Sequence, residues 1–259
     1  MTETALDQAH AAMDAAPKDE AARLRFFERL ADAELHVLLE DDAGETVVPK
    51  VFPLEDGPIV LAFDREDRLA AFGEGPVPHA ILSGRTLAGH LAGQGLGLGL
   101  NLGVAPSSIL LPAAAVGWLA KTVATAPAAL EARPVEVAPP ANVPEPFLAA
   151  LDAKLPAAAG LARVAYLANV VYEGGATGHM LAFIEAHAGA EAALTQAVSE
   201  ALVFSGLEAG AVDVAFLSAS DALAARLART ALKLELPEAN VGFVQQPPGR
   251  NPKKPPILR

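Results

Sequence analysis

Large aliphatic residues alternate with small or polar residues along the sequence GLGLGLNLGV, between Gly95 and Val104. A period of two residues is the period of a β-strand, so the pattern predicts a strand with a leucine face and a nearly bare face. Glycine weakens a strand unless something packs close to it. The bare face formed by Gly95, Gly97, Gly99 and Asn101 therefore predicts either a closely packed helix, which we favour, or a ligand platform.

The hydrophobic pattern predicts further elements in the first 124 residues. Helices are expected over residues 4–15, from Pro17 onward, over 83–94 and after Pro112, and strands over 34–40, 47–54, 59–63 and 107–111. Asp64 followed by Asp67 resembles a capping box, so we expect these residues to begin a short helix rather than to bind a metal.

The second half repeats the mixture of helices and strands. The expected order is a helix at 147–155, strands at 163–172 and 180–185, a helix at 190–204, a strand at 212–217 and a helix at 218–232. Alanine and proline dominate residues 125–146, which we interpret as an extended linker. The fold class is predicted as α+β: two small α/β sandwich domains, each a mixed sheet packed against helices, at residues 1–124 and 147–245.

Charge and cysteine content narrow the functional classes. The 259-residue chain has a net charge of −12, which disfavours nucleic acid and anionic membranes as partners, and it has no cysteine for disulfides or thiolate zinc sites. The uncharged stretch 86–120 is interrupted by Gly-rich alternation and prolines, so no membrane span is predicted. The acidic beginning of the chain lacks the pattern of a signal peptide, and we expect a cytoplasmic protein.

The last fourteen residues, 246–259, form a basic, proline-rich tail with five prolines and four positive charges. One interpretation is an inert solubilising tail. The sharper interpretation is that Lys253, Lys254 and Arg259 steer the tail to an acidic surface, where Ile257 and Leu258 dock.

A search by residue type predicts no catalytic, cofactor-binding or metal-binding residue. Gly95 and Gly97 begin a dinucleotide-binding fingerprint, but its third glycine position is occupied by Leu100. No phosphate-binding Gly-Lys-Ser/Thr sequence occurs, and the histidines lack the spacing of a metalloprotease helix. The serines Ser83, Ser107 and Ser218 are interpreted as helix caps and loop residues.

Several segments resemble the SseB family. VLAFDREDRL at residues 60–69, GLNLG at 99–103 and LLP at 110–112 look like its N-terminal domain, whereas the linker and RVAYL at 163–167 look like its C-terminal domain. Two residues depart from the family pattern: Asp64 stands where Thr or Ser usually follows the Phe, and Leu102 where Pro commonly follows the Asn.

The resemblance implies little chemistry, because the family is named for a serine-sensitivity phenotype and has no agreed catalytic residues. Folding signals without a catalytic constellation favour a non-catalytic, cytoplasmic protein that acts as a protein-interaction or regulatory module, with unidentified protein partners. The alternative is an enzyme or a small-molecule-binding protein of amino-acid or sulfur metabolism, suggested by the phenotype and the bare glycine face.

Overall fold

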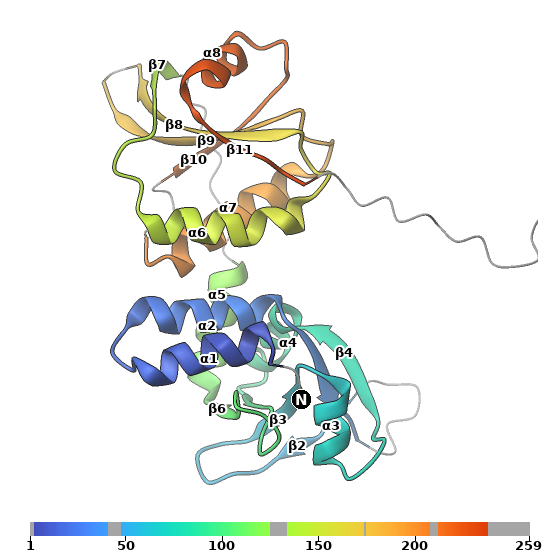
Figure 1. Cartoon of the computed structure of the whole chain (residues 1–259). Helices are drawn as coiled ribbons and strands as arrows, with labels where there is room; N and C mark the ends of the chain where they lie inside the picture. The colour runs from blue at the N-terminus through green and yellow to red at the C-terminus, as the bar shows by residue number, and fades with distance from the viewer. Residues whose placement is uncertain (1–2, 41–47, 125–133, 174, 208–211, 238–259) are drawn as a thin grey trace, which may run out of the picture.

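The structure is a computed structural model that describes residues 3–40, 48–124, 134–173, 175–207 and 212–237. Over these residues the chain forms two mixed β-sheets, each packed against helices (Figure 1). The predicted α+β class is therefore confirmed.

The first two helices begin at side-chain caps. Helix α1 (Ala5–Ala15) begins with a capping box, in which the Thr4 hydroxyl accepts a hydrogen bond from the Asp7 N–H and the Asp7 carboxylate accepts one from the Thr4 N–H. Helix α2 (Glu20–Asp32) begins after Asp19, three residues later than its predicted opening near Pro17, because the Asp19 carboxylate accepts bonds from two N–H groups of the first turn.

The N-terminal sheet has the strand order β4-β1-β3-β5-β6, with β2 also paired to β3. Its strands are β1 (Glu34–Leu38), β2 (Val51–Phe52), β3 (Ile59–Phe63), β4 (His79–Ser83), β5 (Gly97–Leu100) and β6 (Ile109–Leu111). Strands β3 and β5 are parallel and the other pairs are antiparallel. One face packs against α1, α2, α4 (Gly84–Ala92) and α5 (Ala113–Ala124), and the short helix α3 (Glu66–Phe72) packs on the other.

The glycine-rich strand is shorter than predicted. The chain leaves the strand conformation at Asn101, whose φ of 49° is left-handed. A Cβ atom on Gly97 would lie 2.7 Å from the Leu111 carbonyl oxygen, and one on Gly99 would lie 2.6 Å from a Leu61 methyl group. Gly97 and Gly99 are therefore closely packed, mainly by neighbouring strands of their own sheet and by Leu102 rather than by a covering helix, whereas a Cβ atom on Gly95 would meet nothing within 4 Å. Strand β4, within a segment predicted as loop and cap, was not predicted.

The C-terminal sheet has the order β10-β9-β8-β11, with β7 also paired to β8. Its strands are β7 (Pro134–Ala138), β8 (Val164–Tyr172), β9 (Thr177–Ile184), β10 (Val212–Leu217) and β11 (Leu232–Leu234), and its α-helices are α6 (Glu145–Lys154), α7 (Glu191–Phe204) and α8 (Ala222–Thr230). A 3-10 turn, Leu155–Ala158, follows α6. Helices α6 and α7 cover one face of the sheet and α8 covers the other (Figure 1).

The structure corrects the predicted linker at residues 125–146. Residues 125–133 lie outside the described part of the chain, but Pro134–Ala138 pairs with β8, and α6 begins at Glu145. The last part of the predicted linker thus belongs to the C-terminal sheet, since proline is tolerated at the first position of an outer strand. The predicted last helix also ends early, at β11. The tail at 246–259, with Lys253, Lys254, Ile257, Leu258 and Arg259, lies outside the described residues.

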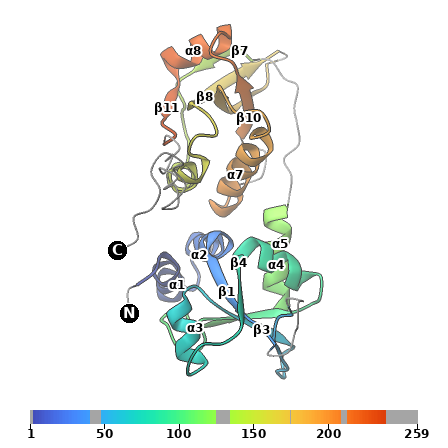
Figure 2. The same ribbon diagram turned by 90° about the vertical axis from the view of Figure 1, so that its right-hand side faces the viewer.

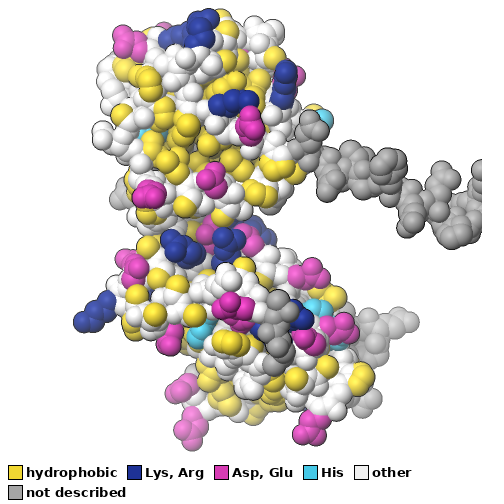
Figure 3. All heavy atoms as spheres, viewed as in Figure 1, with side chains coloured by type: hydrophobic (Ala, Val, Ile, Leu, Met, Phe, Trp, Pro, Cys, Tyr) yellow, Lys and Arg dark blue, Asp and Glu magenta, His cyan; other side chains and the backbone are white. Residues whose placement is uncertain are grey.

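A buried charge cluster joins the two halves of the chain. Helices α1 and α2 lie on the side of the N-terminal domain that faces the C-terminal domain (Figures 1 and 2). Lys154 of α6, which is almost fully buried, lies 2.6 Å from the Asp32 carboxylate of α2 and 3.0 Å from the Glu200 carboxylate of α7. Arg85 of α4 also contacts Glu200, at 2.8 Å. Acidic and basic side chains gather where the halves meet (Figure 3), and the ring of Trp118 packs near that of Phe204.

Candidate functional site

Two of the segments that resemble the SseB family, 60–69 and 99–103, meet at one end of the N-terminal sheet. Strands β3 and β5 are parallel neighbours, so their carboxyl ends lie side by side, and Asp64 and Asn101 are the residues that directly follow them. In α/β sheets this edge is where ligands commonly bind. This edge is therefore the candidate functional site in the described part of the N-terminal domain.

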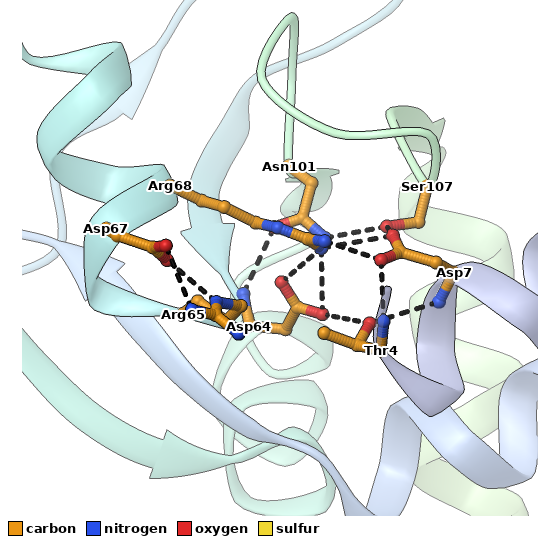
Figure 4. Close-up of polar contacts among 8 residues, drawn as sticks. All are labelled: Thr4, Asp7, Asp64, Arg65, Asp67, Arg68, Asn101 and Ser107. Carbon is orange, nitrogen blue, oxygen red and sulfur yellow. Dashed lines mark hydrogen bonds and ion pairs between the residues drawn. The ribbon is translucent and has the colours of Figure 1, made fainter. Parts of the chain in front are cut away.

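An arginine held by two carboxylates occupies this edge (Figure 4). The Arg68 guanidinium donates to both oxygens of Asp7, at 3.0 and 2.5 Å, and to Asp64 at 2.8 Å. The side chains of Arg68 and Asp7 are 1% exposed and that of Asp64 is 4% exposed. The two aspartates come from different segments: Asp7 lies in the first turn of α1, whereas Asp64 follows β3.

Three further polar side chains complete the network. The Asn101 carbonyl oxygen accepts a bond from the Asp64 N–H at 3.1 Å, and its amide group donates to the Ser107 hydroxyl at 2.8 Å. Ser107 in turn donates to Asp7 at 2.6 Å, and the Thr4 hydroxyl donates to Asp64 at 2.8 Å. Both oxygens of each aspartate therefore have partners within the network (Figure 4).

The network stabilises charged forms of its members. Burial alone raises the pKa of Asp7, but hydrogen bonds from Arg68 and Ser107 outweigh burial and hold that pKa well below its usual range. Burial likewise lowers the pKa of Arg68, and the two aspartates more than reverse that effect. Every carboxylate oxygen of the network accepts a hydrogen bond, and the arginine is buried. These properties suit a structural role, in which the network connects α1 and α3 to the strand ends, better than a role in acid–base chemistry.

The sequence placed only part of this network. Asp64 does not cap α3 as predicted: the N-cap is Arg65, which makes no side-chain cap bond, and Asp64 binds Arg68 and Thr4 instead. Asn101 was singled out for its position on the glycine face. Asp7 and Arg68 were not predicted as members of the network. The available signals were the capping spacing of Thr4 and Asp7 and an arginine, Arg68, between a charged run and apolar residues, but neither reveals contacts between residues 61 positions apart.

A shallow hollow of about 420 Å³ lies beside the network, lined by residues of β1 and of the segment that begins α3. Its lining residues are Glu34, His36, Asp64, Arg65, Glu66 and Asp67. The His36 ring lies 5.1 Å from that of His79 on β4, between ring centres, and its Nδ1 atom is buried with no hydrogen-bond partner among the residues that the structure describes. Burial, and then the neighbouring His79, lower the pKa of His36.

Among the described residues, no three His, Asp or Glu side chains are grouped so that they could hold a metal ion. Within the same residues, none of the helices has the length and apolar character needed to cross a membrane.

The fold and this network define a mixed-sheet α+β domain closed by a buried arginine–carboxylate cluster. Residues 6–118 match the family model described as the SseB protein N-terminal domain. This part of the chain is therefore similar to the SseB N-terminal domain, as its motifs predicted, and the match includes five of the six residues of the network, all except Thr4. The match does not extend into the C-terminal half, where the resemblance to an SseB C-terminal domain stays a prediction. No curated protein and no solved structure matches the chain.

Proposed function

We propose that this protein is a non-catalytic interaction module that binds a protein partner in the cytoplasm. The observation that carries the proposal is the open edge of the N-terminal sheet at β4, which Figure 1 shows along the outer side of the domain. Proteins often recognise an extended peptide by adding it as a strand to such an edge.

The backbone of β4 is suited to strand addition. In the described part of the chain, β4 has β1 as its one neighbour in the sheet. The Leu39 N–H donates to the Pro78 carbonyl, and hydrogen-bonded pairs recur at every second position of an antiparallel ladder. Ala80 and Leu82 therefore direct their backbone groups toward β1, whereas the N–H and C=O of Ile81 point to the open edge.

The edge also lacks the usual protection against pairing. Lysine, proline or a bulge commonly blocks edge strands, but the sequence of β4, HAILS, has neither residue, and its register with β1 is continuous. The Ile81 side chain is 51% exposed. Ile81 lies on the same sheet face as its register partner His36, which lines the hollow with Glu34. These features favour an extended partner segment with an apolar residue that contacts Ile81 and a basic residue that pairs with the acidic residues of the hollow, such as Glu34.

Affinity capture with matched variants tests the proposal. Wild-type protein, Ile81→Lys and Leu110→Lys are used as bait under low-salt crosslinking. Leu110→Lys is the matched control, because Leu110 is 52% exposed, about as much as Ile81, and lies on β6 at the opposite edge of the sheet. We expect specific partners to be captured by wild type and Leu110→Lys and to be lost with Ile81→Lys. Capture of the same proteins by all three baits, or turnover of a small molecule by the purified protein, would contradict the proposal.

A further inference from the structure

The C-terminal sheet contains a topological switch point. Strand β9, helix α7 and strand β10 form a parallel βαβ unit, so the carboxyl ends of β9 and β10 lie next to each other. After β9 the chain continues to α7 on one face of the sheet, whereas after β10 it continues to α8 on the other (Figure 1). Neighbouring connections that leave to opposite faces open a crevice at the strand ends, and ligands of α/β sheets commonly bind there.

A cavity of about 840 Å³ lies on the α8 side of the sheet, bordered by β8, α8 and the segment around β11, and it reaches the switch point at Ile184 and Ala219. Its size falls within the range of small-molecule sites, roughly 300–1,000 Å³. Buried Val164 and Ile184 line it from the sheet, and buried Ala224 lines it from α8. The other α8 residues of the lining, Ala225 and Ala228, are also alanines. Because alanine side chains are small, α8 does not fill the space between itself and the sheet at this point.

The polar groups of the cavity carry one unbalanced positive charge. The lining includes Arg163, Lys233 and Glu235. Lys233 and Glu235 neutralise each other in an ion pair of 2.7 Å. Arg163 is exposed, and its guanidinium has no ion-pair or hydrogen-bond partner among the described residues. The lining residues thus carry a net charge of +1 in a chain of net charge −12, and the Glu185 carboxylate at the border of the cavity is held by the Ala219 N–H. Tyr166 adds a half-buried aromatic ring to the same lining.

The backbone at the strand ends is fixed in an unusual conformation. Glu185, the residue directly after β9, has a left-handed φ of 53°, which non-glycine residues rarely adopt. Its carboxylate accepts a hydrogen bond of 2.5 Å from the N–H of Ala219, which follows β10 and lines the cavity. The two loops that border the switch point are thereby tied together. Backbone strain of this kind is concentrated at ligand sites and switch regions.

We propose that this crevice binds a small monocarboxylic acid with an apolar or aromatic body. The carboxylate pairs with the Arg163 guanidinium, whose planar fork matches a carboxylate in two parallel hydrogen bonds. The body lies between Tyr166 and the apolar floor formed by Val164, Ile184 and Ala224. One unpaired cation fits a monoanion, whereas a phosphoryl dianion calls for further cations or a cradle of backbone N–H groups.

This inference goes beyond the proposed interaction function and does not depend on it. The crevice lies in the C-terminal domain, whereas β4 is in the N-terminal sheet, so loss of ligand binding and loss of partner capture are measured with different variants. The Ile81→Lys protein is expected to bind the acid as wild type does.

The test uses the full chain and a defined probe, 3-phenylpropionate, with 3-phenylpropionamide as its neutral counterpart and phenyl phosphate as the alternative anion. Binding is measured by calorimetry, and the site is located by NMR shifts of the Val164 and Ile184 methyl groups. We expect the carboxylate to bind more tightly than the amide and the phosphate. We expect Arg163→Met to weaken its binding at least about tenfold, as loss of a hydrogen-bonded charged partner does.

Two more variants separate the site from the fold. Ala228→Phe fills the crevice from an exposed helix position and should abolish binding while the thermal melt of the free protein is retained. Arg229→Met removes a neighbouring exposed arginine outside the lining and should bind as wild type does. The proposal is overturned if no probe binds at millimolar concentration, if the amide binds as well as the acid, or if Arg163→Met and Arg229→Met behave alike.

Discussion

Replacing Asp7 by alanine tests whether the buried network holds the N-terminal domain together. In the wild-type protein two aspartates and one arginine leave a net charge of −1 in a site that is at most 4% exposed. Asp7→Ala leaves Arg68 with Asp64, a neutral pair, but removes the acceptor for Ser107 and for the Thr4 N–H. Arg68→Met instead leaves two neighbouring carboxylates without their cation.

The expected magnitudes follow from these residual charges. Breaking a buried pair by removing one partner costs about 3–5 kcal/mol. We expect Asp7→Ala near the lower limit, because the remaining charges balance, and Arg68→Met near or above the upper limit. The control is Asp67→Ala, which removes the exposed ion pair with Arg65 and should change the free energy of unfolding by less than about 1 kcal/mol.

Urea unfolding monitored by the fluorescence of Trp118, the single tryptophan of the chain, measures these differences. The pKa of Asp7 is lowered in the folded protein, so its contribution to stability is complete above the pKa of the unfolded chain, about 4, and is lost as the pH falls below it. The gap between wild type and Asp7→Ala should therefore shrink on acidification. A cost for Asp7→Ala as small as that for Asp67→Ala, or a smaller cost for Arg68→Met than for Asp7→Ala, would refute this reasoning.

Three further predictions concern packing, domain contact and chain segments. Gly99→Ala places a Cβ atom 2.6 Å from a leucine methyl group and should destabilise the domain by about 1–3 kcal/mol. Gly117→Ala adds a Cβ atom on helix α5 that meets nothing within 4 Å, and it should stabilise the domain by up to about 1 kcal/mol. Thermal melts of both variants measure these changes. Lys154→Met removes the cation that contacts Glu28, Asp32 and Glu200 and leaves Arg85 as the remaining cation beside Asp32 and Glu200. The loss should increase the radius of gyration in small-angle scattering; an unchanged radius would show that Arg85 and the apolar contacts suffice. Limited proteolysis should cut first within residues 125–133, and first cuts in the Gly97–Leu100 strand would contradict this prediction. Deletion of residues 246–259 should leave the melting temperature nearly unchanged, and a lower melting temperature for the truncated chain would contradict that prediction.

Local signals in the sequence predicted most elements but not their partners. The strand at Val212–Leu217 was predicted with its observed bounds and the helix predicted over residues 4–15 was found at Ala5–Ala15, because periodicity depends on neighbouring residues. Strands β4, β7 and β11 were missed. Each is short and lies on the outside of a sheet, and β7 begins with proline, so pairing with a neighbouring strand decides their conformation.

The candidate sites depend even more on long-range contacts. Asp64 satisfies a capping pattern, yet its carboxylate binds Arg68 and Thr4, because burying the arginine requires more than one acceptor. The crevice next to Arg163 forms where β8, α8 and the segment around β11 come together beside the switch point. No short-range pattern encodes that arrangement, although the order of strands and helices in this half was predicted apart from β7 and β11.

Amide hydrogen exchange of β4 tests the central claim, binding of a partner at the open edge, most directly. The protein is compared alone and in complex with a partner captured by the affinity experiment. Strand addition predicts that exchange at the outward-pointing Ile81 amide slows strongly in the complex, while the amides of Ala80 and Leu82, already bonded to β1, change little. Unchanged exchange at Ile81 in a saturated complex, with protection at another surface instead, would contradict the account.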